Sequence, residues 1–501
     1  MEISFQNKSV DTYREISFQT KKVQESVESV VPDTDEDICQ IASVQSSVLL
    51  KSKDITSRGV LISGEARASL LYIAEGQNSV SFVRLSKAFS IEYDIPDVTP
   101  DALAQINLSV LSAEARIINP RKVSVSFEIA GEMSCYVREA LDVESLLPSD
   151  ACPGLHVKYE NTELATVNAV CEKTFSVNEQ FSFPGGKPKP TRIVSGIACF
   201  SVADTQLVAG RIIVKGTANL TVCYLSDEVN YPVKAEFSTP YSQIIDIGEE
   251  NIAFCSAFVE LTGAYFDIAD GINGEKILNT ELHAVMQLAG ISRRTVSYAA
   301  DSYCNLMPGK CSCQECCFSA VSDTVKVKLT ADERVNIADE CVDVLSVFTS
   351  PARVVNEQGR ISASIGLDVV YRTADGRIEA AKRSVSMDGE SLDENVRIYN
   401  AVVADAYLRP DGQYVDGHFV LEISGVSLKK IEFEKLICVE LDEEQAYEFG
   451  KYPTVTLVRT DGESLWELAK QYHSSVEKIA AMNDGAEGDL SGKMLLIPKT
   501  I

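Results

Sequence analysis

The chain has 501 residues, of which 45% are hydrophobic and 24% charged, a composition typical of a globular protein with three or four domains. Its 46 Lys and Arg against 73 Asp and Glu give a net charge of −27. Such a charge repels phosphate backbones and anionic bilayers, so we predict no binding to nucleic acids. No run of 18 apolar residues occurs in the sequence, so we expect no insertion into a membrane.

The first residues lack the basic stretch and apolar stretch that make up a secretory signal. The 14 cysteines are spread along the whole chain. We therefore expect a reduced protein inside the cell.

Up to about residue 435 most of the sequence has the pattern of β-strands. Residues 123–127 and 325–329 alternate apolar and polar side chains, and turn signals such as residues 74–78 and 270–274 separate the runs. Regular short runs of this kind predict a mainly β protein built from packed antiparallel sheets.

The chain repeats itself weakly. Residues 58–72, 210–224 and 359–371 each contain a glycine turn, a β-patterned run and a final tyrosine, and their first turn glycines lie 151 and then 149 residues apart. Each copy is followed by a later strand with a glycine, at Gly131, Gly290 and Gly425. This period is too long for a solenoid repeat and indicates three whole domains of one type.

We predict sandwich-like β domains over residues 1–150, 151–322 and 323–435, each a separate folding unit. An acidic linker, residues 436–451, and a small domain, residues 452–501, complete the chain.

Two motifs in the first repeat resemble the SPOCS domain family. Residues 31–38, Val-Pro-Asp-Thr-Asp-Glu-Asp-Ile, are similar to the signature Leu-Pro-Asp-x-x-Pro-Asp-Ile, and residues 119–123 resemble the start of a strand with Ser-Pro-Arg-Arg. Residues 181–190 and the strand that follows fit the second copy of the family. The third copy keeps only its Gly-Arg strand and its last strand, so we interpret it as degenerate.

The C-terminal segment predicts strand, helix, helix, strand. Residues 454–458 form the first strand, and Ser464 with Glu467 has the spacing of a capping box at the start of a helix. A second capping box, Ser474 with Glu477, predicts the second helix. Residues 494–497 form the closing strand.

This order, together with residues 462–469, Gly-Glu-Ser-Leu-Trp-Glu-Leu-Ala, resembles the LysM domain with its Gly-Asp-Thr-Leu-Trp-x-Ile-Ala motif. The resemblance implies that two loops at one end bind the partner or glycan. In this chain they are Gly462, Glu463, Ser464 and Leu465, and opposite them Asn483, Asp484 and Gly485. We expect Trp466 to pack in the core of this small domain.

Five cysteines lie close together between the second and third repeats: Cys304, Cys311, Cys313, Cys316 and Cys317. A zinc ribbon needs two Cys-x-x-Cys pairs, and only Cys313 with Cys316 has that spacing. We interpret the segment as a cysteine-rich loop without a metal, and a metal or redox role is the weakest alternative.

No other pattern supports catalysis or a cofactor. Asp33, Asp35 and Asp37 have the spacing of a calcium loop, but Ile38 occupies the position that needs Gly, so we predict a solvated turn. The glycine pair at 185–186 lacks the rest of a phosphate loop, and the four histidines are scattered. We therefore predict that the protein is not an enzyme.

Three SPOCS-type domains followed by one LysM domain resemble the organisation of spore-coat morphogenetic proteins of clostridia. The resemblance implies a scaffold in the mother-cell cytoplasm, at the forespore surface, whose LysM domain binds the ATPase of the coat's basement layer. The alternative is the commoner role of LysM domains, binding N-acetylglucosamine chains of peptidoglycan at the cell wall.

The cysteine interpretation makes a prediction about metal content. The purified protein under reducing conditions should contain free thiols and no stoichiometric zinc, because an incomplete ligand set binds zinc poorly. Elemental analysis that finds one zinc per chain, lost when Cys313 and Cys316 are both replaced by Ser, would contradict it.

Overall fold

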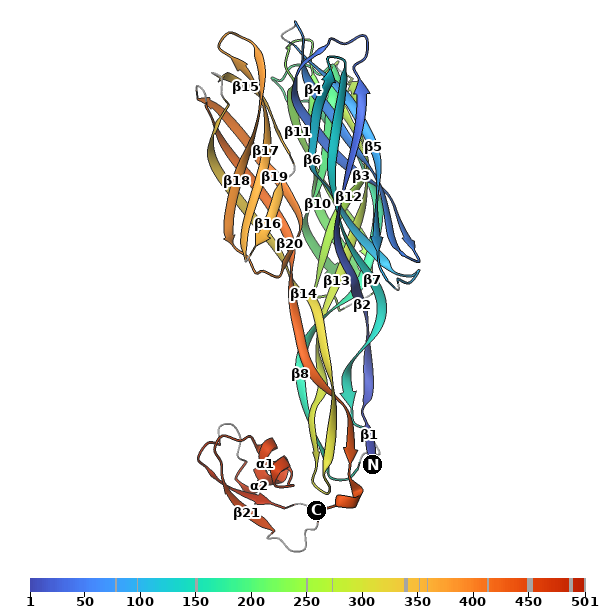
Figure 1. Cartoon of the computed structure of the whole chain (residues 1–501), viewed down its shortest axis with the longest axis vertical. Helices are drawn as coiled ribbons and strands as arrows, with labels where there is room; N and C mark the ends of the chain where they lie inside the picture. Colours follow the sequence, from blue (N-terminus) through green and yellow to red (C-terminus); the bar gives the residue numbers. More distant parts are fainter. Residues whose placement is uncertain are drawn as a thin grey trace.

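The computed structural model describes residues 1–499 except 77–78, 97, 149–151, 249–250, 273, 338–340, 351, 358, 412–413, 448–453 and 486–489. Figure 1 shows an elongated molecule with a broad head, a narrow stalk and a small helical domain beside the far end of the stalk. The prediction of a mainly β protein is confirmed, since the described helices are all short and lie near the C-terminus.

The strands before the small domain form three consecutive units. The first unit contains β2 (Gln6–Val30), β3 (Ile38–Thr56), β4 (Gly59–Ala74), β5 (Val80–Asp94), β6 (Leu103–Asn119) and β7 (Lys122–Leu146). The second contains β8 (Leu155–Ser182), β9 (Arg192–Val208), β10 (Arg211–Leu225), β11 (Val233–Asp246), β12 (Phe254–Asp270) and β13 (Lys276–Cys304). The third contains β14 (Gly309–Asn336), β15 (Cys341–Thr349), β16 (Arg353–Glu357), β17 (Arg360–Thr373), β18 (Ile378–Ser391), β19 (Val396–Asp411) and β20 (Tyr414–Leu441).

The three units have the same antiparallel topology. One sheet has the repeated Gly-turn strand at its centre, in the orders β3-β4-β5, β9-β10-β11 and β15-β17-β18, with β16 also paired to β17. The other sheet joins the first strand of the unit to its last two, in the orders β2-β7-β6, β8-β13-β12 and β14-β20-β19. The short strand β1 (Glu2–Ser4) pairs with β20. The two sheets of each unit enclose one hydrophobic core, as in a β-sandwich.

The three units share a further core in addition to the one that each sandwich encloses. Their repeated tyrosines are fully buried inside the sandwiches: Tyr72, Tyr224 and Tyr371. The preceding residues point to the opposite face of the same strands and meet in one core shared by all three units: Leu71, Cys223 and Val370. Because both faces of these strands are buried, their ends are continuously apolar rather than alternating. The sequence alone could not show that the second face was covered by the other units.

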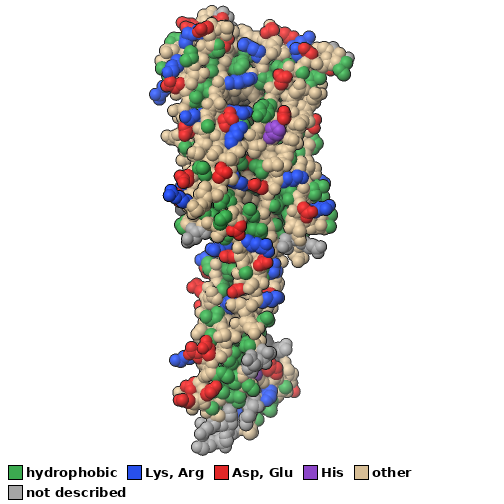
Figure 2. All heavy atoms as spheres, turned by 90° about the vertical axis from the view of Figure 1, so that its right-hand side faces the viewer, with side chains coloured by type: hydrophobic (Ala, Val, Ile, Leu, Met, Phe, Trp, Pro, Cys, Tyr) green, Lys and Arg blue, Asp and Glu red, His purple; other side chains and the backbone are tan. Residues whose placement is uncertain are grey.

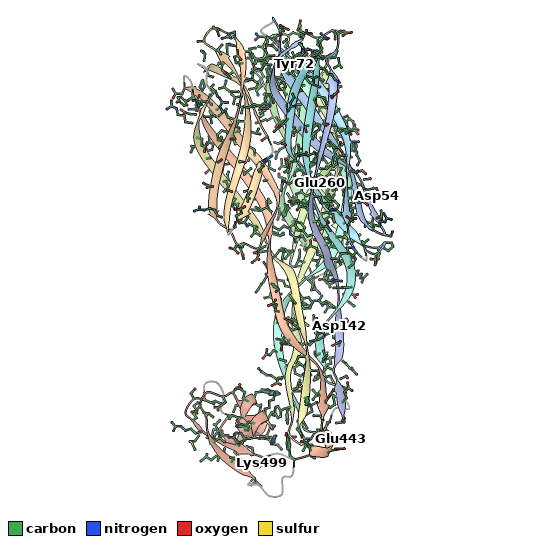
Figure 3. All side chains as sticks on the ribbon, in the orientation of Figure 1. Asp54, Tyr72, Asp142, Glu260, Glu443 and Lys499 are labelled. Atoms are coloured by element: carbon green, nitrogen blue, oxygen red, sulfur yellow. The ribbon has the colours of Figure 1, made fainter. Side chains whose placement is uncertain are left out.

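Polar side chains fix the units against one another. The Gln287 amide donates to the Ile106 carbonyl at 2.7 Å and accepts from the Ile106 N–H at 2.9 Å, as a neighbouring strand would. Leu108 lies two positions after Ile106 on β6, and its N–H donates to the buried carboxyl of Glu260 at 3.2 Å. Burial raises the pKa of Glu260 to about 8. This side chain lies among the strands of the head (Figure 3).

The stalk consists of the first and last strands of each unit, which extend beyond the sandwiches as three antiparallel pairs (Figure 1). Their inward side chains form one core, with Val10 and Val143 from the first pair, Leu164 and Val296 from the second, and Cys316 and Phe433 from the third. Lys435 is fully buried there, and its Nζ donates to Asn7 Oδ1 at 3.1 Å and to the Asp142 carbonyl at 2.8 Å. The stalk is therefore a packed structure and not a set of loose ribbons.

The interpretation of residues 304–317 as a loop is wrong. Cys304 ends β13, only residues 305–308 connect it to β14, and the other four cysteines lie on β14. Strand β14 also crosses the boundary expected at 322/323, and β20 continues to Leu441, inside the segment expected to be a linker. Register shifts at Ser312/Cys313 and at Val321/Asp323 interrupt the alternation of β14, which is why its sequence does not read as a strand.

Cys313 and Cys316 lie on opposite sides of β14, the first exposed and the second buried. A strand directs residues three apart to opposite faces, so these two thiols do not converge on one ion. In the described part of the chain, no group of three or more His, Cys, Asp or Glu side chains is arranged to hold a metal.

An arginine holds the turn that contains Asp33, Asp35 and Asp37. The Arg121 guanidinium donates to Asp37 Oδ1 at 2.7 Å and to the Asp35 carbonyl at 3.2 Å, and the Val31 N–H donates to the Arg121 carbonyl at 2.9 Å. The two motifs noticed in the first repeat therefore pack together, and a cation of the chain itself satisfies the acidic turn.

The C-terminal domain has the expected order of elements: β21 (Val455–Arg459), α1 (Leu465–Gln471), α2 (Val476–Met482) and β22 (Met494–Pro498). A 3-10 helix, η1 (Glu443–Gln445), precedes it at the base of the stalk, where Figure 3 labels Glu443. The capping box of Ser464 and Glu467 is confirmed. The second helix begins one residue later than expected, since Ser475 is its N-cap, while the Ser474 hydroxyl donates to the Pro498 carbonyl instead.

The close approach of two strands in the first unit gives a stability prediction. The Tyr93 hydroxyl donates to the Gly131 carbonyl at 2.7 Å, and a Cβ at Gly131 would meet this hydroxyl and lie 2.9 Å from Ile91 Cδ1. Gly131→Ala should therefore lower the free energy of opening β7 by about 1–3 kcal/mol, measured by amide hydrogen exchange. The matched control is Gly185→Ala, where no atom lies within 4 Å of the new Cβ. Equal protection in both variants would contradict the prediction.

Candidate functional site

The first of the two expected binding loops connects β21 to α1. Gly462 has φ 110°, a left-handed conformation that favours glycine, and Glu463 folds back so that its Oε2 accepts from the Asp461 N–H at 2.7 Å. Thr460 anchors the start of the loop, since its hydroxyl donates to the Leu490 carbonyl and its N–H to the Lys493 carbonyl. The loop is therefore fixed on the segment that precedes β22.

Two members of this loop are used within the domain. The Ser464 hydroxyl accepts from the Glu467 N–H at 3.3 Å and donates to Glu467 Oε2 at 2.9 Å. Leu465 is half-buried and packs against the hydrophobic core of the domain. At the N-terminus of α1, a helix of seven residues, the capping box thus satisfies the N–H groups of Ser464 and Glu467.

The second loop follows α2. The Asn483 amide donates to the carbonyls of Ile479 and Leu496, both at 2.7 Å, and accepts from the Leu496 N–H at 2.8 Å. Asp484 and Gly485 follow with φ 53° and 75°, and both are exposed. Asn483 therefore fastens the end of α2 to β22, and the groups that a ligand could reach are those of Asp484 and Gly485.

The two expected loops are both at the surface and carry negative charge. Gly462, Ser464, Asp484 and Gly485 are exposed and Glu463 is partly exposed. Gly462 lies beside Ser491, on the segment that follows the second loop. Leu465 and Asn483 are partly exposed and also make contacts within the domain.

A contact that the sequence did not predict holds this domain against the stalk. Trp466 Nε1 donates to Asp301 Oδ2 at 2.8 Å, and Lys470 Nζ lies 2.7 and 2.8 Å from the two oxygens of Asp301. The Trp466 ring meets Tyr303 edge to face with centroids 4.9 Å apart. Trp466 packs against the domain core as expected, but its polar edge also binds β13.

Tyr303 extends this contact toward α2. Its hydroxyl donates to the Ser474 carbonyl at 2.9 Å, and its ring stacks on His156 of β8 at 5.0 Å. His473 stacks on Tyr447 at 3.9 Å in the same region. Burial lowers the pKa of both histidines, so the contact favours neutral imidazoles.

Two opposing effects act on the pKa of Asp301. Burial would raise the pKa of its carboxyl, but the hydrogen bonds from Lys470 and Trp466 outweigh burial and lower the pKa. The carboxylate thus remains charged and holds two side chains of α1. Asp301 and Tyr303 are about 160 residues away from the domain they bind, and no local pattern marks them.

The contact with the stalk predicts a change in the fluorescence of Trp466, the single tryptophan of the chain. Asp301→Ala removes both the acceptor of the indole N–H and the partner of Lys470, so Trp466 should become more hydrated and its emission should shift to longer wavelength. Glu163→Ala, which removes an exposed carboxylate of β8, is the control and should leave the emission unchanged. An unchanged spectrum for Asp301→Ala would contradict the contact.

A comparison with protein families finds the SipL, SPOCS domain over residues 37–118 and the LysM domain over residues 460–498. No curated protein and no solved structure gives a match to the chain. None of the helices in the described ranges has the length and apolarity that crossing a membrane requires. The first match covers β3 to β6 in the first unit, and the second covers the C-terminal domain with both expected loops. The chain therefore contains a SipL-type SPOCS domain, a sporulation-related module, and a C-terminal LysM domain of the type that binds peptidoglycan.

Proposed function

We propose that this protein is a non-catalytic scaffold in the morphogenesis of the bacterial spore coat. It acts in the mother cell at the forespore surface, where the LysM domain binds the ATPase of the coat's basement layer and the SPOCS-type units contact other coat material. The matched domains support this proposal, because both are binding modules.

The separation of the head from the LysM domain carries the proposal. Strands β13, β14 and β20 run from the head down the stalk, and strands of 28 or 29 residues span roughly 90 Å at ~3.3 Å per residue. The LysM domain lies beside the far end of this stalk, bound to Asp301 and Tyr303 (Figure 1). A packed spacer with a binding module at each end suits a tether between two layers.

Two further observations support the proposal. The expected LysM loops stay exposed while α1 binds the stalk, so the domain can engage a partner in this arrangement. All 14 cysteines are unpaired, which is the usual state of thiols in a reducing compartment such as the mother cell. Figure 2 shows acidic and basic side chains interspersed over one face of the head and stalk.

The alternative function is peptidoglycan binding, and the LysM match favours it. Its exposed loop glycines, Gly462 and Gly485, leave backbone groups accessible to the amide and carbonyl groups of N-acetylglucosamine. This function requires the protein to meet the cell wall.

Substitutions in the two expected LysM loops test whether the domain binds the ATPase. Glu463→Lys combined with Asp484→Asn removes the negative charge of both loops, and Asn tolerates the left-handed backbone at position 484. The full-length double variant should retain less than roughly a tenth of the wild-type affinity for the ATPase in co-purification and titration experiments. Leu465 is unsuitable for this purpose because its side chain packs in the domain core.

The control is Glu163→Lys combined with Glu333→Gln, which makes the same change of charge at exposed positions of β8 and β14. It should bind the ATPase as the wild type does, and circular dichroism should be the same for all three proteins. Failure of the wild-type protein to bind the ATPase, or sedimentation with purified peptidoglycan as strong as that of a secreted LysM protein, would reject the scaffold in favour of the alternative.

A further inference from the structure

The two-stranded sheet of the LysM domain is apolar on both faces. On its inner face, Leu495 and Ile497 are buried and Val458 is partly buried against the helices. On its outer face, four large side chains are exposed: Val455 by 37%, Leu457 by 58%, Met494 by 53% and Leu496 by 41%. A sheet with one solvated face normally alternates apolar and polar residues. The run of residues 494–497, Met-Leu-Leu-Ile, does not alternate, and this signal is visible in the sequence itself.

The register gathers these side chains into one surface. Leu457 lies directly opposite Leu496, and Met494 lies opposite Arg459. Side chains at alternate positions of a strand share a face, so Val455 and Leu457 continue the same row. We call Val455, Leu457, Met494 and Leu496 the outer face.

The contact with the stalk leaves the outer face accessible. The stalk binds Trp466, Lys470 and the carbonyl of Ser474, all on α1 or on the turn between the helices. The helices cover the inner face of the sheet, so the outer face points away from them into solvent (Figure 1). It is also distinct from the exposed loop residues Asp484 and Gly485.

Positive charge flanks the outer face. Arg459 and Lys493 are exposed at the Met494 end, and neither forms an ion pair with a residue that the structure describes. Residues 454–501 contain five Lys and Arg against seven Asp and Glu, a net charge of −2, whereas the whole chain has −27. The outer face is thus a basic, apolar surface on a strongly acidic protein.

The positive charge of Arg459 and Lys493 indicates which kind of partner fits the outer face. A second copy packed face to face would place its Arg459 and Lys493 against the same cations, which is unfavourable. An N-acetylglucosamine chain carries no carboxylate that could pair with these cations. A protein element with apolar side chains bordered by Asp or Glu complements both features of the surface.

We propose that the outer face is a second contact surface of the LysM domain, used for an acidic, amphipathic element of a protein partner. The inference rests on the proposed function, in which that partner is the coat ATPase, and it deepens that function by assigning protein binding to the sheet and not to the loops alone. Leu457 and Leu496 are the central apolar contacts, and Arg459 and Lys493 pair with the carboxylates.

The test compares full-length variants. Leu457→Thr combined with Leu496→Thr removes the apolar contacts but keeps residues suited to strands, and it leaves the inner face intact. Its affinity for the purified ATPase should fall at least roughly tenfold. Arg459→Glu combined with Lys493→Glu should also weaken binding, and the remaining binding should depend less on salt. The control is Val208→Thr combined with Ile244→Thr, at positions 52% and 54% exposed in the second unit, and it should bind as the wild type does.

The results of these binding experiments distinguish a failure of the inference about the outer face from a failure of the proposed function. If the wild type binds the ATPase and the Leu457/Leu496 variant binds equally well, the inference is overturned while the proposed function stands. If the wild type does not bind, the proposed function fails and the inference fails with it. The inference is also overturned if the wild type alone forms dimers that the Leu457/Leu496 variant abolishes, or if that variant loses binding to purified peptidoglycan instead.

Discussion

The burial of apolar side chains between the three units is the constraint on which the rest of the structure depends. At the head, Leu71, Cys223 and Val370 meet in one core, although they belong to strands about 150 residues apart in the sequence. In the stalk, Val143, Val296 and Phe433 do the same. Fully burying one such side chain stabilises the fold by about 1.5–3 kcal/mol. The units are thus parts of one body, and their mutual orientation follows from this burial.

The shared core explains how the stalk can be long and still ordered. An isolated pair of strands is marginally stable at best in water, and each unit supplies only one pair of strands to the stalk. Three such pairs around a common core bury apolar side chains from all six strands. Lys435 tolerates full burial there because an amide oxygen and a carbonyl accept from its ammonium group. The same packing positions Asp301 and Tyr303 at the far end, where they bind the LysM domain.

The LysM domain presents three different surfaces with different chemistry. The helix α1 meets the stalk through an indole, an ammonium group and one carboxylate. The loops around Glu463 and Asp484 are acidic and exposed, and the outer face of the sheet is apolar and bordered by cations. The contact with the stalk therefore leaves the loops and the outer face exposed.

The sequence by itself determined the features that depend on neighbours along the chain. The alternation of apolar residues indicated the mainly β class, the repeated Gly-turn strand indicated three units, and the spacing of Ser464 and Glu467 indicated the start of α1. Each of these patterns lies within one short segment, because strand faces, turns and helix caps involve residues only a few positions apart.

Only the tertiary structure decided the features that depend on distant contacts. The segment around Cys313 is part of strand β14 because it pairs with β20. Shifts of register hide the alternation of apolar and polar residues in its sequence. Leu465 packs against the domain core and Asn483 bonds to β22, and both contacts involve other elements of the domain. Trp466 binds Asp301 because the LysM domain packs against the end of the stalk, where Tyr303 joins the domain's core. Burial and pairing between residues far apart in sequence leave no local pattern, and so the sequence could not show them.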